Sequence, residues 1–354
     1  MTTANYNKFE ISGRFGARLA KRSYSRFGIA ITVYLLVANL LAAFMSSPLF
    51  FEIMKSLVGV KAAHEIFGSV YYVWIIQVVC MYAVGYPIFR LTLIGVPSKR
   101  EKKSKLSLAE LTVAFLICMA GVQIGAYIGS FVSTLLSLIT GYVPDDTTSI
   151  LIANTPLWLA VLVVVIIGPI VEELIFRKVF IDKLSRFGEW LTIIVSAIAF
   201  GLFHGNFNQL FFATLVGIVL GYVYTKSRNI KYTCILHMLI NFLGTVPVLL
   251  LGDSMVRLEE LMYIQGELTP EQSMTIISTS LSLIGYLLLQ WALAIMGIVM
   301  LIIVLVKRRI TLSPKNKFAL RPIDVPRVAI FNAGALIFLA FSALMLLASV
   351  LPVY

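Results

Sequence analysis

Long apolar runs, separated by short charged stretches, constrain the fold of this chain more than any other feature. Nine such runs are candidate membrane spans: 28–50, 66–89, 108–139, 150–176, 190–206, 209–225, 234–252, 276–306 and 329–352. Runs of about 18 or more apolar residues are long enough to cross a bilayer. Only 13% of the residues are charged, whereas a soluble protein carries about 25%. We therefore predict an all-α, polytopic membrane helix bundle with eight or nine transmembrane helices, in which the short fifth and sixth runs form a tight hairpin or are partly re-entrant.

The distribution of basic residues predicts the orientation of the bundle. The segments 1–27, 90–107, 177–189, 226–233 and 307–328 together hold 26 of the 29 Lys and Arg residues. The loops on the opposite side keep only Lys55, Lys61 and Arg257, and they hold nine carboxylates. Since loops rich in Lys and Arg stay in the cytoplasm, we expect a multi-pass protein of the cell membrane with its N-terminus cytoplasmic and its C-terminus external. The net charge of +12 then reflects topology in a lipid bilayer, and no nucleic acid partner is expected.

The chain reads as one domain with four parts. These are a basic cytoplasmic N-terminus (1–27), N-terminal transmembrane helices (28–149), a core that carries polar motifs (150–252), and an acidic external loop with the C-terminal helices (253–354). The first apolar run exceeds the 7–15 residues of a signal peptide, so we expect an uncleaved membrane helix there.

Ionisable side chains within the predicted spans are concentrated in 172–241. Such groups cost a few kcal/mol each inside a membrane, so their presence indicates function. Three short patterns contain them: Glu172, Glu173 and Arg177 shortly after Gly168-Pro169, then Phe200 with His204, then His237 with Asn241. Hydrogen bonding between helices alone explains any one of these patterns, but explains three on adjacent spans poorly.

Helical geometry predicts how these side chains are arranged. Glu173 and Arg177 are four residues apart with the acid first, which favours an ion pair on one helix face and leaves Glu172 available. Glu172 and His204 are each 16 residues from Gly188, so they should lie at matching depth. Their depth agrees with that of His237 and Asn241 if 178–189 projects one or two turns into the cytosol. The four groups are then expected about 10 Å below the cytoplasmic face.

A carboxylate beside two imidazoles in an apolar pocket is a plausible hydrolytic site. Glu172 could accept a proton from water as a general base, while His204 orients that water. His237 and Asn241 could donate to the oxyanion formed at a peptide carbonyl. The alternative is a metal site, because Glu172, His204 and His237 form a familiar ligand set for zinc with one open position. No cofactor is certain, and a divalent metal such as zinc stays an open alternative.

The three patterns occur in the order E-E-x-x-x-R, F-x-x-x-H and H-x-x-x-N. In this respect the chain resembles the CPBP family of intramembrane proteases, which includes the type II CAAX prenyl endopeptidases and bacteriocin-processing or Abi-like proteins. The resemblance covers roughly 150–252. It implies that Glu172 activates water with support from Glu173, Arg177 and Phe200. It also implies that His204 assists the water and that His237 and Asn241 stabilise the oxyanion, with or without a metal.

The expected function is that of an intramembrane endopeptidase cutting near the cytoplasmic membrane face. The resemblance implies a membrane-associated protein or a peptide precursor as substrate, with a membrane-proximal cleavage site. One alternative is a non-catalytic bacteriocin immunity or membrane scaffold protein. Another is a transporter with a Glu and His proton relay, but neither inverted repeats nor paired broken helices are visible.

Overall fold

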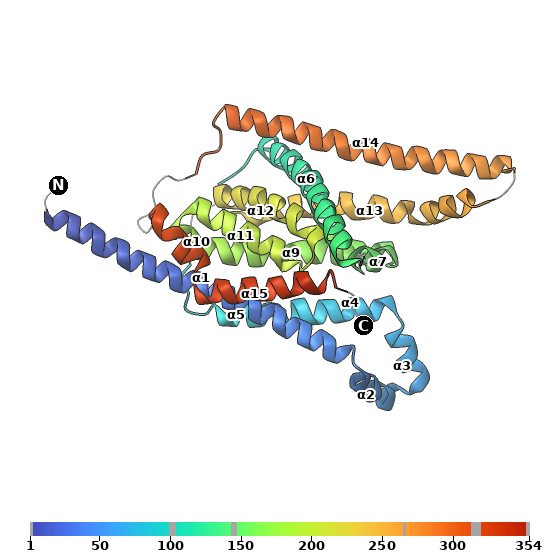
Figure 1. The fold of residues 1–354 in the computed structure, drawn as a ribbon, viewed down its shortest axis with the longest axis horizontal. Helices are drawn as coiled ribbons and strands as arrows, with labels where there is room; N and C mark the ends of the chain where they lie inside the picture. Colours follow the sequence, from blue (N-terminus) through green and yellow to red (C-terminus); the bar gives the residue numbers. More distant parts are fainter. Residues whose placement is uncertain (1–2, 99–103, 143–146, 265–266, 313–319, 352–354) are drawn as a thin grey trace.

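The computed structural model describes residues 3–98, 104–142, 147–264, 267–312 and 320–351, and within these ranges the chain is helical with no strand (Figure 1). The α-helices, in chain order, are α1 (Thr3–Met45), α2 (Pro48–Val58), α3 (Val60–Phe67), α4 (Val70–Gln77), α5 (Tyr86–Thr92), α6 (Leu108–Thr140), α7 (Thr147–Ala153), α8 (Leu157–Ala160), α9 (Gly168–Glu173), α10 (Asp182–Leu184), α11 (Glu189–Phe203), α12 (Phe207–Ser227), α13 (Ile230–Met262), α14 (Pro270–Val306) and α15 (Ala333–Ala348). The π-helical stretches η1 (Val78–Gly85), η2 (Val161–Ile167), η3 (Leu174–Ile181) and η6 (Pro326–Ile330) join several of them, and two short 3₁₀ turns are η4 (Ser185–Phe187) and η5 (Pro322–Asp324).

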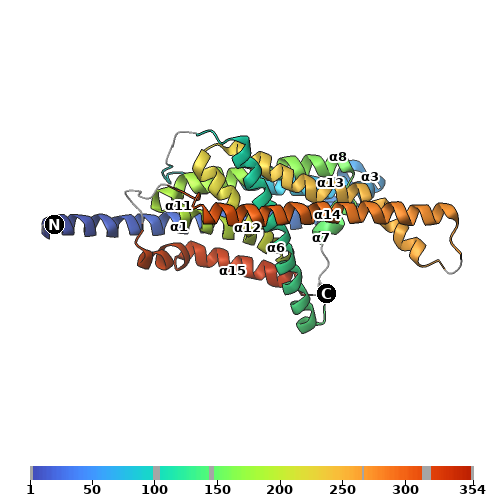
Figure 2. The same ribbon diagram turned by 90° about the horizontal axis from the view of Figure 1, so that it is seen from above.

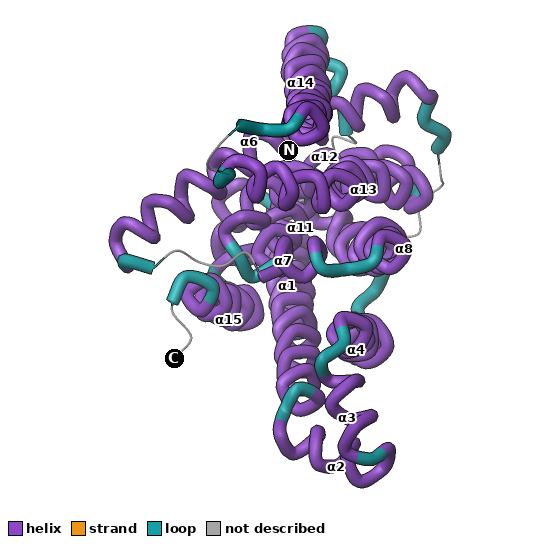
Figure 3. The backbone as a smooth tube through the Cα atoms, turned by 90° about the vertical axis from the view of Figure 1, so that its right-hand side faces the viewer, coloured by secondary structure: helices purple, strands orange, loops and turns teal. Residues whose placement is uncertain are grey.

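Seven helices of the described chain are long and apolar enough to cross a membrane. They are Gly16–Met45, Val70–Thr92, Leu108–Thr140, Leu157–Phe187, Phe207–Ser227, Ile230–Met262 and Pro270–Val306. Pro322–Ile330 and Ala333–Ala348, bent by 58°, make an eighth if they count as one span. Figure 3 views many of these helices nearly end-on. The predicted all-α polytopic bundle is confirmed, but the fifth predicted span is only the 15-residue helix α11, which is too short to cross a bilayer alone.

The helices α11 and α12 form the expected tight hairpin, and glycines allow their close approach. Gly217 and Gly221 of α12 face α11, where an added Cβ would lie 3.0 Å from Ala197 Cα and 3.1 Å from Ile193 Cγ2. On the other side, an added Cβ on Gly201 would overlap Thr214. Small residues let helix backbones pack closely in membranes, so this contact fixes the turn that carries His204.

Several helix ends differ from the sequence prediction. The predicted external loop 253–275 is mostly helical, because α13 continues to Met262 and α14 already starts at Pro270 after a Thr269 cap. The predicted N-terminal segment is helical from Thr3 and continuous with the first span. The second predicted span is interrupted at Gly68 and Ser69, between α3 and α4. Parts of two predicted cytoplasmic segments, 99–103 and 313–319, lie outside the described residues.

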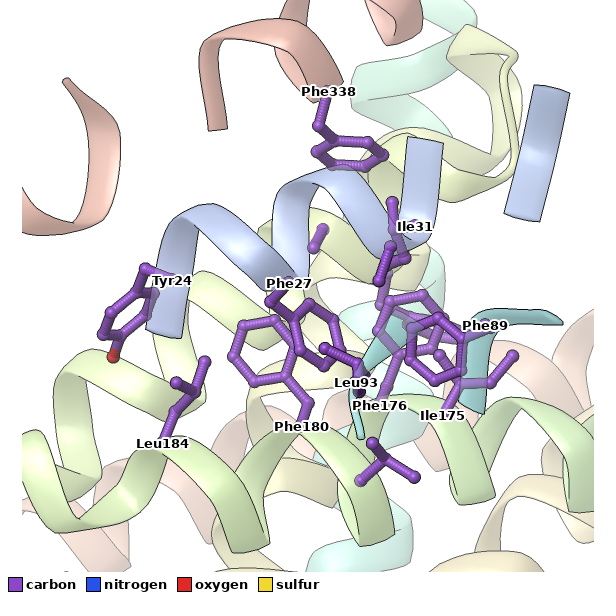
Figure 4. Packing of buried hydrophobic residues seen from close by; sticks show 14 of the residues in the cluster. Tyr24, Phe27, Ile31, Phe89, Leu93, Ile175, Phe176, Phe180, Leu184 and Phe338 are labelled. Carbon is purple, nitrogen blue, oxygen red and sulfur yellow. The ribbon is translucent and has the colours of Figure 1, made fainter. Parts of the chain in front are cut away.

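Aromatic side chains form the largest buried cluster, where α1 packs on the helix that follows the two adjacent glutamates (Figure 4). The ring centroid of Phe27 is 4.1 Å from that of Phe180 and 5.4 Å from that of Phe89. Phe176, from the same π-helical stretch as Phe180, contacts Phe200 of α11 at 5.1 Å. The cluster therefore fixes η3 against α1 and α11, just beyond Glu172 and Glu173.

The segment 178–189 packs against neighbouring helices, and only part of its charge is exposed, with Lys178 the most exposed of its charged residues. Its apolar residues pack in the aromatic cluster, and Asp182 and Glu189 are buried. Asp182 accepts hydrogen bonds from Tyr224 Oη (2.9 Å) and Lys178 Nζ (2.7 Å). Arg228 Nη2 lies 3.4 Å from Glu189 Oε1. Two of the charges that the sequence suggested would face the cytosol, Asp182 and Glu189, thus pair with the end of α12; whether 178–189 extends beyond the bilayer stays a prediction.

Candidate active site

The adjacent carboxylates Glu172 and Glu173 end a short α-helix between two π-helical stretches. The helix α9 begins at Gly168 with Pro169 in its first turn, and η2 and η3 flank it. Such widened turns inside helices often occur at functional sites. Glu173 is completely buried, whereas the side chain of Glu172 is 19% exposed. The two neighbouring carboxylates therefore occupy different environments.

Glu173 is held by two partners. Arg177 Nε lies 3.2 Å from Glu173 Oε2, so the predicted ion pair is present, and both side chains are fully buried. The other carboxylate oxygen, Oε1, accepts a hydrogen bond from His237 Nδ1 at 3.1 Å. This second bond joins α9 to α13 and was not predicted. It means that Glu173 positions His237 and has no remaining role toward solvent.

Phe200 lies at the centre of the motif residues. Its ring is 5.0 Å from the His204 ring and 5.7 Å from the His237 ring, edge-on to both. The Arg177 guanidinium lies 4.6 Å from the ring centroid, a cation–π contact that partly offsets burial of the charge. Phe200 thus supports both imidazoles by packing.

His204 follows directly after α11, and its ring orientation is fixed by the backbone. Nδ1 lies 2.8 Å from the carbonyl oxygen of Phe200. Because a carbonyl can only accept, Nδ1 carries a proton and Nε2 is left to bind another group. The backbone after His204 is held by Asn206, whose side chain donates to the His204 carbonyl and caps α12. The imidazole is therefore presented by a rigid turn.

One cavity brings the predicted catalytic residues together. It has a volume of about 780 Å³, and Glu172, His204, His237 and Asn241 all line it. Most other lining residues are apolar, among them Val73, Met81, Val163, Phe203, Phe212 and Ile240. Three helical segments that are separate in sequence thus place these four polar side chains in one mostly apolar cavity.

The two groups facing each other across this cavity are Glu172 and His237. His237 Nε2 lies 3.6 Å from Glu172 Oε2, longer than a direct hydrogen bond, so each atom can still bind a third group. Asn241 Nδ2 donates to the Val164 carbonyl oxygen at 2.9 Å, and its second N–H stays available. Glu173 and Arg177 neutralise each other, so this buried pair adds no net charge beside Glu172 and His237.

The alternative metal site does not fit this arrangement. Among the described residues, no three His, Cys, Asp or Glu side chains form a group that could hold a metal ion. His237 directs Nδ1 at Glu173, and its other nitrogen faces Glu172. Glu172, His204 and His237 share the cavity, but as placed they do not make a three-ligand site, so no step below uses a metal.

Sequence reasoning missed Tyr82, which lines the same cavity from η1. A Cβ added to Gly168 would lie 3.3 Å from the Tyr82 hydroxyl oxygen, so this hydroxyl sits one helical turn before Glu172. No hydrogen bond of this hydroxyl is found within the described part of the chain. The only available signal was a polar atom in an otherwise apolar run, far in sequence from the motifs.

Comparison with known proteins agrees with this site. Residues 154–243, which contain every motif residue, match the sequence model of the family described as type II CAAX prenyl endopeptidase Rce1-like. Over this stretch the resemblance to the CAAX-type proteases is confirmed.

Two curated relatives match the same part of the chain. A Bacillus subtilis (strain 168) protein named "Putative membrane peptidase YdiL" is 28% identical over 98 residues, which is 27% of this chain and 40% of the relative. A Lactococcus lactis subsp. lactis (strain IL1403) protein named "UPF0177 protein YbdI" is 28% identical over 94 residues, which is 26% of this chain and 51% of the relative. The chain thus spans about half the length of these relatives or less. No solved structure gives a significant match.

Proposed function

We propose that this protein is an intramembrane endopeptidase that hydrolyses a peptide bond near the cytoplasmic membrane face. One observation carries the proposal: Glu172 is partly exposed in an apolar cavity with two imidazoles and an amide, whereas its neighbour Glu173 is buried and neutralised. A carboxylate that faces a cavity and is not held by a permanently charged side chain is suited to general base catalysis. A purely structural or immunity protein has no need of such a group.

In the proposed reaction, water attacks the peptide carbonyl carbon while Glu172 takes one of its protons. His204 orients that water through Nε2, the ring nitrogen that the Phe200 carbonyl leaves free. The oxyanion accepts hydrogen bonds from His237 Nε2 and from the second Asn241 N–H. As the C–N bond breaks, Glu172 returns the proton to the leaving amine. Glu173 and Arg177 act indirectly, by orienting His237.

The family match and the cavity both support a substrate class. A mostly apolar cavity of about 780 Å³ accommodates an extended, apolar peptide segment better than a charged one. Together with the match to CAAX prenyl endopeptidases, this supports a membrane-associated substrate, either the C-terminal tail of a lipidated protein or a small peptide precursor.

The test is cleavage of membrane-anchored candidate peptides by the purified full chain in lipid vesicles. We expect Glu172→Gln to remain folded and to lose about a hundredfold to ten-thousandfold in turnover, the usual contribution of a general base. Glu65→Gln, at an exposed position on α3, is the matched control and should cleave normally. A chelator should leave the wild-type rate unchanged. Equal cleavage by Glu172→Gln would contradict the proposal.

A further inference from the structure

Two basic side chains from distant helices converge on the short turn after α5. Arg26 of α1 donates through Nη2 to the carbonyl oxygens of Thr92 (3.1 Å) and Ile94 (2.8 Å). Lys183 of α10 donates through Nζ to the carbonyl oxygen of Val96 at 2.6 Å. Both side chains therefore bind the same few residues of backbone and lie close together, and among the residues that the structure describes neither forms an ion pair at this turn.

Two further arginines complete a group that we call the basic cluster: Arg26, Arg90, Lys183 and Arg186. Arg90 is exposed in the last turn of α5, and Arg186 follows Lys183 by about one helical turn. Arg90 precedes Thr92 by two residues, so it adjoins the same turn. The four basic residues thus belong to the three segments that meet at this turn.

Asp182, which directly precedes Lys183, does not neutralise the basic cluster. Both carboxylate oxygens of Asp182 are already bound, one by Lys178 and the other by Tyr224, with Arg228 at 3.6 Å. Asp182 is therefore committed to the buried contacts with α12, and within the described residues no carboxylate pairs with any of the four charges.

Arg186 has donors that no group in the described part of the chain satisfies. Its Nε and Nη2 atoms are buried and have no hydrogen-bond partner, and its guanidinium lies 4.8 Å from the Phe187 ring centroid. Leaving donors of a charged group buried and unpaired is costly. An anion from outside the chain would remove that cost, and a guanidinium binds phosphate oxygens in two parallel hydrogen bonds.

The position of the basic cluster indicates where that anion comes from. One candidate span ends at Thr92 and another at Phe187, while the apolar part of α1 begins at Phe27, next to Arg26. The basic cluster therefore lies at the level where three apolar segments end. In a bilayer this is the level of the lipid headgroups, where basic pockets between helices bind anionic lipids.

We propose that Arg26, Arg90, Lys183 and Arg186 bind the phosphate of an anionic phospholipid headgroup. The site is separate from the catalytic cavity, and the proposal does not depend on the proposed protease activity. Because η3 connects Glu173 directly to α10, a lipid held by Lys183 and Arg186 would also fix the end of the helix that carries the two glutamates.

The experiment measures retention of phosphatidylglycerol against phosphatidylcholine by the purified full chain, using native mass spectrometry. We expect the wild type to prefer phosphatidylglycerol and Arg186→Gln to lose about fivefold in affinity, as for one basic residue near an anionic surface. Lys183→Gln should behave similarly. Lys231→Gln is the matched control, because it removes an equal charge on the same predicted side at an exposed position and should bind normally.

Further measurements keep the proposal falsifiable. Size-exclusion profiles and melting temperatures without added lipid establish that each variant is folded, and Arg186→Lys, which keeps the charge, should retain most of the affinity. The proposal is overturned if Arg186→Gln binds like the wild type, or if Lys231→Gln weakens binding equally. If inorganic phosphate alone displaces phosphatidylglycerol at millimolar concentration, the lipid assignment is wrong and the site binds free phosphate.

Discussion

At the scale of single residues, two adjacent glutamates have acquired different functions because they differ by about 100° around one helix. Glu173 faces the interior, where it binds Arg177 and His237. Glu172 faces the cavity. The spacing of Glu173 and Arg177 was sufficient to predict their pairing from the sequence. The bond to His237 was not predictable, because it joins residues 64 positions apart and depends on how α13 packs.

This division predicts opposite outcomes for the two carboxylates. Glu173→Ala should cost about 3–5 kcal/mol of stability, because it leaves the fully buried Arg177 without its partner. Glu172→Gln should unfold at the wild-type temperature. Thermal unfolding in detergent, followed by intrinsic fluorescence, compares the two. Our division of roles would be wrong if Glu172→Gln destabilised the protein as strongly as Glu173→Ala does.

The Tyr82 hydroxyl supplies a second test at this scale. If it binds the attacking water or the substrate, Tyr82→Phe should lose about threefold to tenfold in turnover, the effect of one neutral hydrogen bond. Tyr34→Phe is the control: its hydroxyl is buried without a partner and does not line the cavity. It should therefore cleave at the wild-type rate. Matching rates for Tyr82→Phe and the wild type would leave Tyr82 with only a packing role.

At the scale of helices, the turn that carries His204 depends on the close contact of α11 with α12. Gly201 has no space for a side chain, since an added Cβ would overlap Thr214. We expect Gly201→Ala to cost about 1–3 kcal/mol through overpacking and to reduce cleavage, because His204 lies three residues further on.

Gly252→Ala on α13 is the matched substitution, since nothing lies within 4 Å of its added Cβ. It should leave stability unchanged or raise it by up to about 1 kcal/mol, because alanine favours helix more than glycine does. Melting temperatures of the two variants test this pair. A Gly201→Ala variant as stable as Gly252→Ala would show that the hairpin can adjust without loss.

The presence of the helices was predictable from the sequence, whereas where several helices end and which charged residues are buried was not. Apolar runs identify spans because the bilayer demands them, but α13 continues as a helix for about ten residues past its apolar run, where hydropathy gives no signal. The charged residues of 178–189 suggested exposure, because the sequence alone does not show which charges find partners inside the bundle. Their partners, Tyr224 and Arg228, lie about 40 residues further along the chain and become neighbours only in the folded bundle.

At the scale of the whole molecule, three contacts gather the predicted cytoplasmic segments at one end. Ser104 N donates to the Ser227 carbonyl oxygen at 2.9 Å, and Lys226 pairs with Glu110 at 3.0 Å. Leu320 N donates to the Phe187 carbonyl oxygen at 3.1 Å. In Figures 1 and 2 this end, with α10 and the start of α1, lies opposite the end where α13 meets α14. Segments that lie together at one end of the bundle are expected on the same side of the membrane.

This arrangement makes topology a test of the whole interpretation. Reporter fusions after residues 105, 230 and 315 should all report a cytoplasmic location, and fusions near 145 and 260 an external one, because 26 of the 29 basic residues belong to the first group of segments and basic loops stay inside. The fusion at 230 is the most informative, since it immediately precedes the helix of His237. An external reading there would invert the bundle and move the cleavage site to the outer face. Different readings at 105 and 230 would contradict the contact between Ser104 and Ser227.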